Sequence, residues 1–355
     1  MTMLAEVIDA VIGIDTHRDS HEVEIADPAG KLIATMRIGN DSGGFAQLLA
    51  TIAELAPGPR VVACIEGSRS YGIGLARALA ASGLLVIECE QPSRKQRRGK
   101  GKSDPIDAHL AVLTALRLDT SRLPAPRADG DREALRILLV ARLEMTVAAT
   151  AQASRLRALL LAGDDTDRRA ARKALSNAAL AALAGRELPA HADREHAVRQ
   201  AEISRLALAL AQARRQLKDN RAQLLAVVDD IAPGLTGRYG AGPVSAAQAI
   251  VSFSHPGRCR SEAAFAALGG TSPIPASSGR TIRHRLNRGG DRALNRAIHA
   301  IALTRMRTCP RTRAYVARRT AEGKTTREIR RCLKRYIARE LYRQLNRSMK
   351  PPMSP

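Results

Sequence analysis

Val11-Ile12-Gly13-Ile14-Asp15 is a short apolar run that ends in a carboxylate. Such a run is typical of a buried strand. The segments 21–27 and 32–38, which follow it, alternate between apolar and polar residues, and Asp27-Pro28-Ala29-Gly30 supplies a turn between them. The chain is therefore expected to begin with three consecutive strands.

Helices and further strands alternate after these three strands. A helical pattern over 42–55 leads into the apolar run Val61-Val62-Ala63-Cys64-Ile65, which ends at Glu66-Gly67. A second helical pattern over 72–82 precedes another strand over 84–89. This order of elements predicts an α/β region with a mixed sheet and helices on its faces.

The segment 131–231 is rich in Ala, Leu and Arg and is almost wholly helical in character. In its later part, steps of three and four alternate between Ile203, Leu206, Leu210, Ala213, Leu217, Asn220, Leu224, Val227 and Ile231. This seam is typical of a coiled coil whose register the single Asn fixes. A helical hairpin that folds on itself explains the seam nearly as well, so a role in self-association is only slightly favoured.

The last part of the chain is predicted to be basic and mainly α-helical. Thr325 and Glu328 have the spacing of a capping box that opens a final helix. The apolar stripe expected on this helix consists of Ile329, Leu333, Tyr336, Ile337 and Leu341. Breaks at Pro124-Ala125-Pro126 and Ala232-Pro233-Gly234 separate the three parts of the chain. We therefore expect three domains, over 1–125, 126–231 and 232–355.

Positive charge dominates the composition. The 355 residues include 57 Lys and Arg against 34 acids, a formal charge of +23. Residues 271–355 hold 22 Lys and Arg and four acids, and 94–102 places six basic residues in nine positions. Two basic runs in one chain predict a nucleic-acid partner. Because aromatic residues make up only 2% and Trp is absent, backbone and shape contacts are expected to outweigh base stacking.

The composition also excludes several classes of protein. Five scattered Cys without a CxxC pair rule out a disulfide scaffold and a zinc ribbon, and they suit a reducing cytosol. There is no run of 18 apolar residues, and the acidic N-terminal stretch is unlike a secretory signal. We therefore expect a cytoplasmic, nucleoid-associated protein without a membrane span.

Four carboxylates lie where strands are predicted to end and a helix to begin. Asp15 and Glu66 each end a buried strand, and Asp104 and Asp107 lie three apart at a helix N-terminus. The carboxyl ends of strands gather at one edge of an α/β sheet, where four carboxylates repel one another unless cations neutralise them. Two divalent ions about 3.5–4 Å apart suit such a site and catalyse attack at phosphodiesters. Taken singly, each residue is better explained as a strand end, a turn or a helix cap.

Two loops are candidates for contact with nucleic acid. Gly240-Ala241-Gly242-Pro243 resembles the turn of a helix–hairpin–helix, whose glycines let backbone N–H groups approach phosphate, although a plain tight turn explains it equally well. Ser277-Ser278-Gly279-Arg280 precedes further basic residues, and from these residues alone a flexible linker is the more direct interpretation. The candidate nucleic-acid-binding residues are Arg94, Lys95, Arg97, Arg98, Lys100, Lys102, Gly240, Gly242, Arg280, Arg283, Arg285, Arg288 and Arg292. Without the spacing of a metal motif, the residues expected in the core or on the surface are His17, His21 and His109.

Several of these segments together resemble one family. Ile12-Gly13-Ile14-Asp15-Thr16-His17, Ile65-Glu66-Gly67 and Lys102-Ser103-Asp104-Pro105-Ile106-Asp107-Ala108 resemble the DEDD motifs of a RuvC-like nuclease domain. The segments that resemble its companion transposase domain are Gly240-Ala241-Gly242-Pro243-Val244-Ser245-Ala246-Ala247, Ala267-Leu268-Gly269-Gly270-Thr271-Ser272-Pro273, Ser277-Ser278-Gly279 and Arg288-Gly289-Gly290-Asp291-Arg292. Nearly the whole chain thus resembles the DEDD insertion-sequence transposases of the family numbered one hundred and ten.

The resemblance implies a fold, a chemistry and partners. It implies a RuvC-like, RNase H-like N-terminal domain. The implied Mg²⁺ ligands, for two ions that Mn²⁺ can replace, are Asp15, Glu66, Asp104 and Asp107. A C-terminal serine, Ser278 with Ser277 beside it, would attack DNA and become transiently linked to it. The implied partners are the DNA of the element ends and target, a structured guide RNA from the element, and further copies of the chain in a dimer or tetramer, in the bacterial cytosol.

Three functions compete at this point. The leading hypothesis is a site-specific transposase or recombinase that uses both the carboxylates and Ser278. A RuvC-like, Holliday-junction-type endonuclease would need the same carboxylates, activate water with its metal, and leave both serines dispensable. A basic nucleic-acid scaffold would need neither set of residues.

Overall fold

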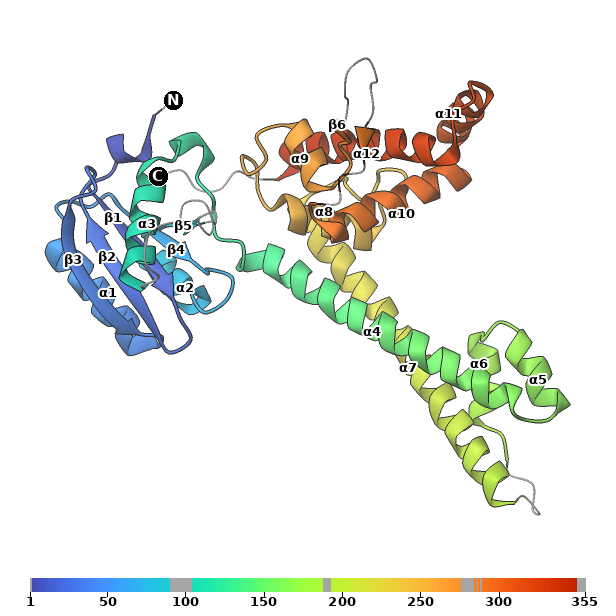
Figure 1. Ribbon diagram of the computed structural model, residues 1–355. Coiled ribbons are helices and arrows are strands. Elements are labelled where there is room, and N and C mark those ends of the chain that lie inside the picture. The colour runs from blue at the N-terminus through green and yellow to red at the C-terminus, as the bar shows by residue number, and fades with distance from the viewer. Residues whose placement is uncertain are drawn as a thin grey trace.

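The computed structural model describes residues 2–89, 104–187, 193–275, 284–285, 287 and 289–349. These residues form a sheet region near the N-terminus, a long helical arm, and a cluster of helices that we call the C-terminal cluster (Figure 1). The sheet region and the C-terminal cluster both lie at the base of the arm, and the rest of the arm extends away from them.

Five strands of the described chain form one mixed sheet in the order β3-β2-β1-β4-β5. Their bounds are β1 (Ala10–Thr16), β2 (Ser20–Ala26), β3 (Leu32–Gly39), β4 (Val61–Glu66) and β5 (Leu85–Cys89). β1, β2 and β3 pair antiparallel, whereas β4 pairs parallel with both β1 and β5. The predicted mixed sheet and its strand order along the chain are therefore confirmed.

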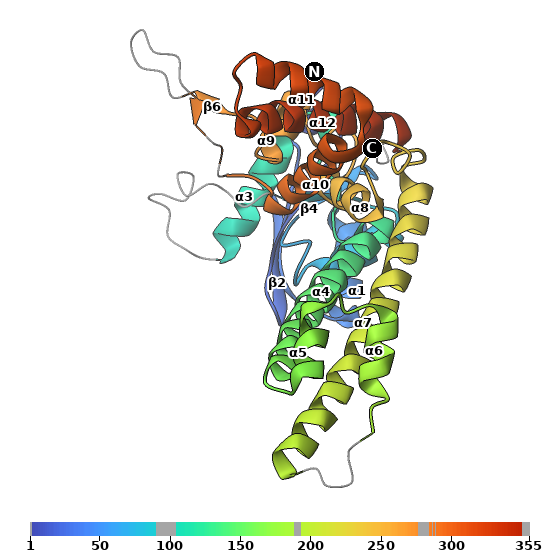
Figure 2. The same cartoon turned by 90° about the vertical axis from the view of Figure 1, so that its right-hand side faces the viewer.

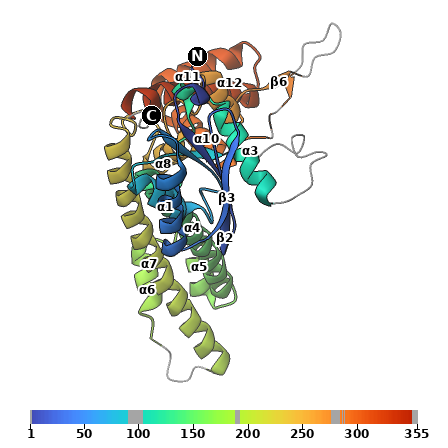
Figure 3. The same cartoon turned by 90° about the vertical axis from the view of Figure 1, so that its left-hand side faces the viewer.

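Helices cover both faces of this sheet, as its alternating side chains require. α1 (Ser42–Leu55) and α2 (Ile73–Ala81) lie on one face, in the cluster that contains Ile12, Ile14 and Ile65. α3 (Asp104–Leu116) lies on the other face, in the cluster that contains Val11, Val62 and Cys64. Figure 3 shows the sheet between α1 and α3. Short 3₁₀ turns are η1 (Leu4–Glu6) and η2 (Thr120–Arg122).

The arm consists of α4 (Gly130–Leu161), α5 (Asp165–Arg172), α6 (Asn177–Ala184) and α7 (Arg194–Ile231). α4 and α7 lie side by side (Figures 1 and 2). The predicted seam packs within the chain: Ile203 and Leu206 lie in one cluster with Leu156 of α4 and with α5 and α6. The Nδ2 of Asn220 donates to the Leu138 carbonyl at 2.9 Å, so this Asn ties α7 to α4 at one register. A seam between two chains stays a prediction.

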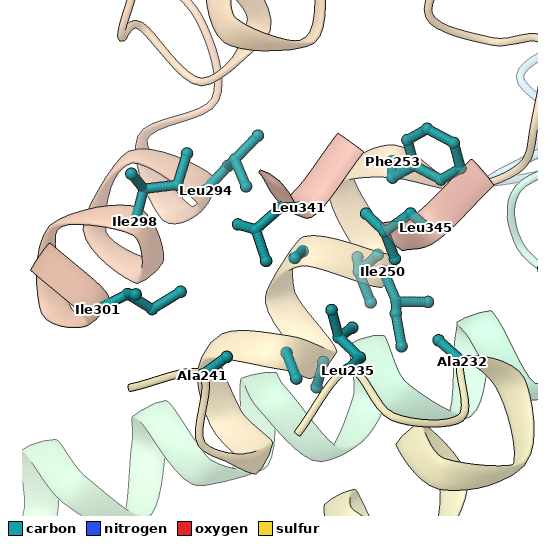
Figure 4. Close-up of a cluster of buried hydrophobic side chains, with 14 of the residues drawn as sticks. Ala232, Leu235, Ala241, Ile250, Phe253, Leu294, Ile298, Ile301, Leu341 and Leu345 are labelled. Carbon is teal, nitrogen blue, oxygen red and sulfur yellow. The ribbon is translucent and has the colours of Figure 1, made fainter. Parts of the chain in front are cut away.

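The C-terminal cluster is mainly helical, as predicted. Its elements are α8 (Pro243–Phe253), α9 (Glu262–Leu268), β6 (Ile274–Pro275), β7 (His284–Arg285), α10 (Arg292–Thr308), α11 (Pro310–Ala321) and α12 (Thr326–Ser348). Figure 4 shows how Phe253 and Ile250 of α8, Ile298 of α10 and Leu341 and Leu345 of α12 gather in its core. All five are buried.

The final helix confirms its predicted start and corrects its predicted stripe. Thr325 and Glu328 form the reciprocal capping box, with Thr325 N–H donating to Glu328 Oε2 at 2.9 Å. The buried stripe runs through Leu333 and Ile337 in steps of four, which rotate it away from Tyr336. Tyr336 is therefore 55% exposed, and its assignment to the apolar stripe is wrong. Among the helices described, none is long and apolar enough to cross a membrane.

Candidate active site

Two buried carboxylates lie next to each other at one edge of the sheet. β1 and β4 are parallel neighbours in which Ile14 pairs with Ile65, so Asp15 and Glu66 are the next residues along the two strands. Both point to the α3 face by alternation, and they are only 8% and 7% exposed. The register of the strands therefore places these two predicted residues next to each other.

A glycine brings the start of α3 to the same edge. A Cβ at Gly13 would lie 2.1 Å from the carbonyl oxygen of Ala108, so only glycine permits this approach of helix and strand. Val11 packs with Ala111, Val112 and Ala115, further along α3. α3 therefore runs antiparallel to β1, and its first turn lies over the carboxyl ends of the strands.

That first turn carries the other two predicted carboxylates. Asp107 immediately precedes Ala108 and is partly buried. Asp104 begins α3, four residues before Ala108, and its side chain lies outside the described atoms. Among the side chains that are described, no three Asp, Glu, His or Cys converge closely enough to hold a metal ion. The oxygen donors at this edge are nevertheless of the type that hard divalent ions prefer.

Sequence reasoning did not assign to the site three further groups at this edge: Glu24 went unnamed, and His17 and His109 were expected only in the core or on the surface. Glu24 of β2 pairs with Gly13, is 6% exposed, and lies 2.7 Å from His109 Nδ1 through its Oε1. His17 Nε2 lies 3.9 Å from Asp15 Oδ2. The alternation of β2 places Glu24 on the α3 face, but only the packing of α3 brings His109 to it.

A second charged group, which we call the arginine joint, connects the sheet region to the C-terminal cluster. It comprises Arg69, Glu88, Arg127, Arg132 and Arg258. Arg127 Nε donates to Glu88 Oε2 at 2.8 Å, and Arg69 Nε lies 3.0 Å from Glu88 Oε1. Burial alone would raise the pKa of Glu88, but the hydrogen bond and charge of Arg127 and the charge of Arg69 outweigh it and lower that pKa.

The joint reaches α8 through backbone carbonyls. Arg132 Nη2 donates to the Val251 carbonyl at 3.0 Å, and Arg258 donates to the Ser252 carbonyl. Burial and the neighbouring guanidinium groups lower the pKa of Arg132 to about 10. The same two causes lower the pKa of His255 to about 4, so its ring is neutral at pH 7. The arginine joint has four Arg and one Glu. The sequence did not predict it, because these residues come from four separate segments.

The segments of the C-terminal cluster that carry the family resemblance dock on one another. Ser252 Oγ donates to Asp291 Oδ2 at 2.5 Å, and Asp291 caps α10 by accepting from Ala293 and Leu294. Gly290 has φ +110°, and its missing Cβ leaves room for the Leu268 carbonyl, to which Asp291 N–H donates at 2.7 Å. The Arg288–Arg292 segment is thereby fixed against the Ala267–Pro273 segment at its described residues.

The predicted nucleic-acid contacts are only partly described. Gly242 caps the N-terminus of α8, and Gly240 packs against the Ile301 carbonyl of α10. Arg285 is exposed on β7, and Arg292 begins α10. The predicted residues that lie outside the described residues are Arg94, Lys95, Arg97, Arg98, Lys100, Lys102, Ser277, Ser278, Arg280, Arg283 and Arg288.

Comparison with known families gives two matches along the chain. Residues 12–162 match the model of DEDD transposases of the IS110 type, described as a transposase. Residues 235–317 match the model described as the transposase IS116/IS110/IS902 family. The first match contains the carboxylate edge and α4, and the second contains α8 to α10. A search of the curated proteins finds no relative that matches.

Proposed function

The chain belongs to the IS110 family of transposases, which act on the phosphodiester bonds of DNA, and we propose that its carboxylate edge is the catalytic centre of a site-specific recombinase of an insertion sequence. The observation that carries this proposal is the placement of Asp15 and Glu66 on paired parallel strands, under the first turn of α3. In this proposal the sheet region is the RuvC-like, RNase H-like domain over 1–125.

The proposed metal ligands are Asp15, Glu66, Asp104 and Asp107. Their oxygen donors, the burial of the first two and the common edge fit one or two Mg²⁺ ions, for which Mn²⁺ can substitute. When bound, such ions polarise the phosphate and offset negative charge that develops during cleavage. The protein itself holds these carboxylates in place. The strand register and the Gly13–Ala108 contact support this role.

The C-terminal residues and the partners take part in the same reaction. Ser278, or Ser277 beside it, attacks a DNA phosphorus, so that an Oγ–P bond forms as one P–O bond of the strand breaks. The basic loop over 94–102 and the residues around Arg285 and Arg292 bind the nucleic acids, among them a guide RNA encoded by the element. The domain over 126–231, which contains the arm, assembles two or four chains in the cytosol, and 232–355 is the transposase domain.

The first experiment tests the carboxylate edge. A supercoiled plasmid that carries the element ends is incubated with Mg²⁺ and with protein that retains its co-purified RNA. Asp15→Asn is expected to lower strand cleavage at least about 1000-fold, because it removes a carboxylate that neutralises the metal. Asp19→Asn is the matched control, since this Asp lies in the turn after β1 and its side chain is 77% exposed. Equal cleavage by both variants would refute the site.

A second experiment separates the recombinase from the nuclease and from the scaffold. Denaturing gels are used to detect protein covalently attached to labelled DNA, in wild type and in Ser277→Ala and Ser278→Ala. Loss of the adduct and of strand transfer in one of these variants supports the serine step. Cleavage of four-way junctions by both variants, without an adduct, identifies the structure-specific endonuclease. Full function after Asp104→Ala identifies the scaffold.

A third experiment tests the guide RNA. The gene is expressed with its native flanks, and the RNA that stays bound at moderate salt is sequenced. A single RNA species encoded by the flanks supports the guided recombinase, whereas bulk cellular RNA alone contradicts it.

A further inference from the structure

A cavity of about 410 Å³ lies between the turn 270–273 and the exposed face of α12. From α12 it is lined by Arg331, Arg335, Tyr336 and Arg339. The turn belongs to one of the segments that carry the family resemblance, and nothing in the proposed chemistry uses it. A cavity of this size is in the range of small-ligand sites.

The wall made by the turn is fixed before any ligand arrives. Asn295 Nδ2 donates to the Gly269 carbonyl at 2.6 Å, and Lys334 Nζ donates to Asn295 Oδ1 at 2.6 Å. Thr271 Oγ1 donates to the Ala266 carbonyl at 3.0 Å. These bonds tie the turn to α10, α12 and α9, so the cavity is preorganised.

The α12 wall has more positive than negative charge. Glu262 is shared by three guanidinium groups: Arg339 Nε at 2.8 Å, Arg343 Nη2 at 3.5 Å and Arg335 Nη2 at 3.8 Å. In the described part of the chain, the buried Nη1 of Arg335 has no hydrogen-bond partner. A planar donor with spare capacity, beside other guanidinium groups, is suited to phosphate.

Tyr336 adds an aromatic surface to these cations. Its ring meets Tyr315 edge-on at 6.3 Å between centroids, and Arg318 lies 5.6 Å from the centroid of Tyr315. This edge contact supports the Tyr336 ring while the side chain stays 55% exposed. Tyr336 also lines the cavity beside Arg331, Arg335 and Arg339, so an aromatic ring and guanidinium groups face the same space.

We propose that this cavity binds one nucleotide of a single strand, with its base stacked on Tyr336 and its phosphates held by Arg331, Arg335 and Arg339. This proposal rests on the proposed function, in which nucleic acid is the partner. It adds that this surface recognises the single-stranded form of the nucleic acid. A base within a duplex is covered on both faces by its neighbours, so only an unpaired base can stack on the ring. Single-stranded DNA and single-stranded RNA share this chemistry.

The test measures equilibrium binding by the full-length protein. Fluorescence anisotropy is recorded with a labelled 12-nucleotide DNA, the RNA of the same sequence and the matching DNA duplex. Tyr336→Ala is expected to weaken single-strand binding about 10-fold and to leave duplex binding within about 2-fold, because one stacking contact is lost. Tyr336→Phe retains the ring and is expected to restore single-strand binding.

Single-stranded DNA with abasic sites provides a second binding measurement, which can be made on the wild-type protein and so does not depend on how well a variant folds. Wild type is expected to bind an abasic DNA about 10-fold more weakly than the intact strand, whereas Tyr336→Ala binds both alike. The proposal is overturned if wild type does not distinguish them, or if Tyr336→Ala weakens duplex and single strand equally. A loss confined to the RNA, or to the DNA, identifies the source of the nucleotide. Strand transfer is assayed separately, so the cavity and the catalytic proposal can fail independently.

Discussion

The carboxylate edge of the sheet and the basic face of α12 are both charged, yet they are built in opposite ways. Asp15 and Glu66 are nearly buried and belong to paired strands. Arg331, Arg335 and Arg339 lie on one helix, where Arg331 is exposed and the other two are partly exposed. Arg335 and Arg339 share the carboxylate of Glu262 with Arg343. Burial leaves the carboxylates at the edge few side-chain conformations, whereas the arginines on the α12 face can adopt many.

This difference separates a site that depends on geometry from one that depends on total charge. Cleavage requires reacting groups to be held to within a fraction of an ångström. Attraction of a polyanion instead sums over many contacts, each of which displaces a counterion. Single changes at the edge should therefore abolish function, and single changes on α12 should reduce it by degrees.

Among changes that leave all four proposed metal ligands in place, the largest effect is expected from Gly13→Ala. The new Cβ would collide with the Ala108 carbonyl, so α3 must move away from β1 and carry Asp104 and Asp107 with it. Strand cleavage is expected to fall at least about 100-fold, as for other displacements of about 1 Å. Nucleic-acid binding by the C-terminal cluster should change little, because that cluster is not touched.

Gly185→Ala is the matched control for that change. A Cβ at Gly185, in the arm, would have its nearest neighbour at 3.5 Å, the Ala181 carbonyl oxygen. Cleavage by this variant should equal that of wild type. If Gly13→Ala cleaves as well as Gly185→Ala, the carboxylates do not depend on the contact between α3 and β1.

Glu88→Gln tests the joint that holds the two regions together. The substitution leaves Arg127 and Arg69 against a neutral amide, in a place where the Glu88 side chain is 5% and the Arg127 side chain 12% exposed. The free energy of unfolding is expected to fall by about 3 kcal/mol, as when one partner of a buried pair is removed. Denaturant titration measures the loss.

The exposed ion pair of the arm provides the comparison for Glu88→Gln. Asp165 pairs with Arg168, and its side chain is 88% exposed. Asp165→Asn should change the free energy of unfolding by less than about 0.5 kcal/mol. Equal effects from the two variants would show that the joint is no stronger than a surface ion pair.

Acid should weaken the C-terminal cluster through His255. The pKa of this ring is lowered from 6.5 to about 4 by burial and by nearby arginines, so the unfolded chain takes up a proton first as the pH falls. Stability is therefore complete above pH 6.5 and is lost as the pH falls toward 4. By pH 5 the loss should reach about 2 kcal/mol, which His255→Gln should remove. If His255→Gln shows the same pH dependence of stability as wild type, other groups cause that dependence.

Glu88 acts in a separate pH window. Its pKa is lowered below its ordinary value of 4.5, so its contribution to stability is present above pH 4.5 and is lost as the pH falls further. Burial also lowers the pKa of His21 and of His299, so both rings contribute between pH 5 and pH 7. In that range Glu88 stays charged, and the difference between wild type and His255→Gln isolates the contribution of His255.

Local patterns predicted the sheet region well. The apolar run that ends at Asp15 and the run that ends at Glu66 each determine a buried strand, and two parallel strands place their ends together. The capping box at Thr325 likewise depends on residues three apart. Such features follow from neighbours in sequence, so they can be predicted from it.

Contacts between distant segments were not predictable in this way. The pair of Glu24 and His109 depends on how α3 lies on the sheet, and the arginine joint depends on how Arg127 and Arg132 link β5 to α8. Tyr336 was misplaced because its exposure depends on the rotation of the buried stripe along α12. Residue types and their spacing along the chain do not determine these contacts between distant segments.

The smallest effect is expected from Arg331→Ala on the exposed face of α12. Removal of one of many phosphate contacts should weaken duplex binding only about 3-fold at moderate salt, and it should reduce the slope of log affinity against log salt by about 1. Arg215→Ala is the charge-matched control on α7, where the side chain is also exposed but lies on the arm. Anisotropy titrations at several salt concentrations distinguish the two. If both variants change the slope equally, the attraction comes from net charge over the whole molecule; if only Arg331→Ala does, the polyanion lies on α12.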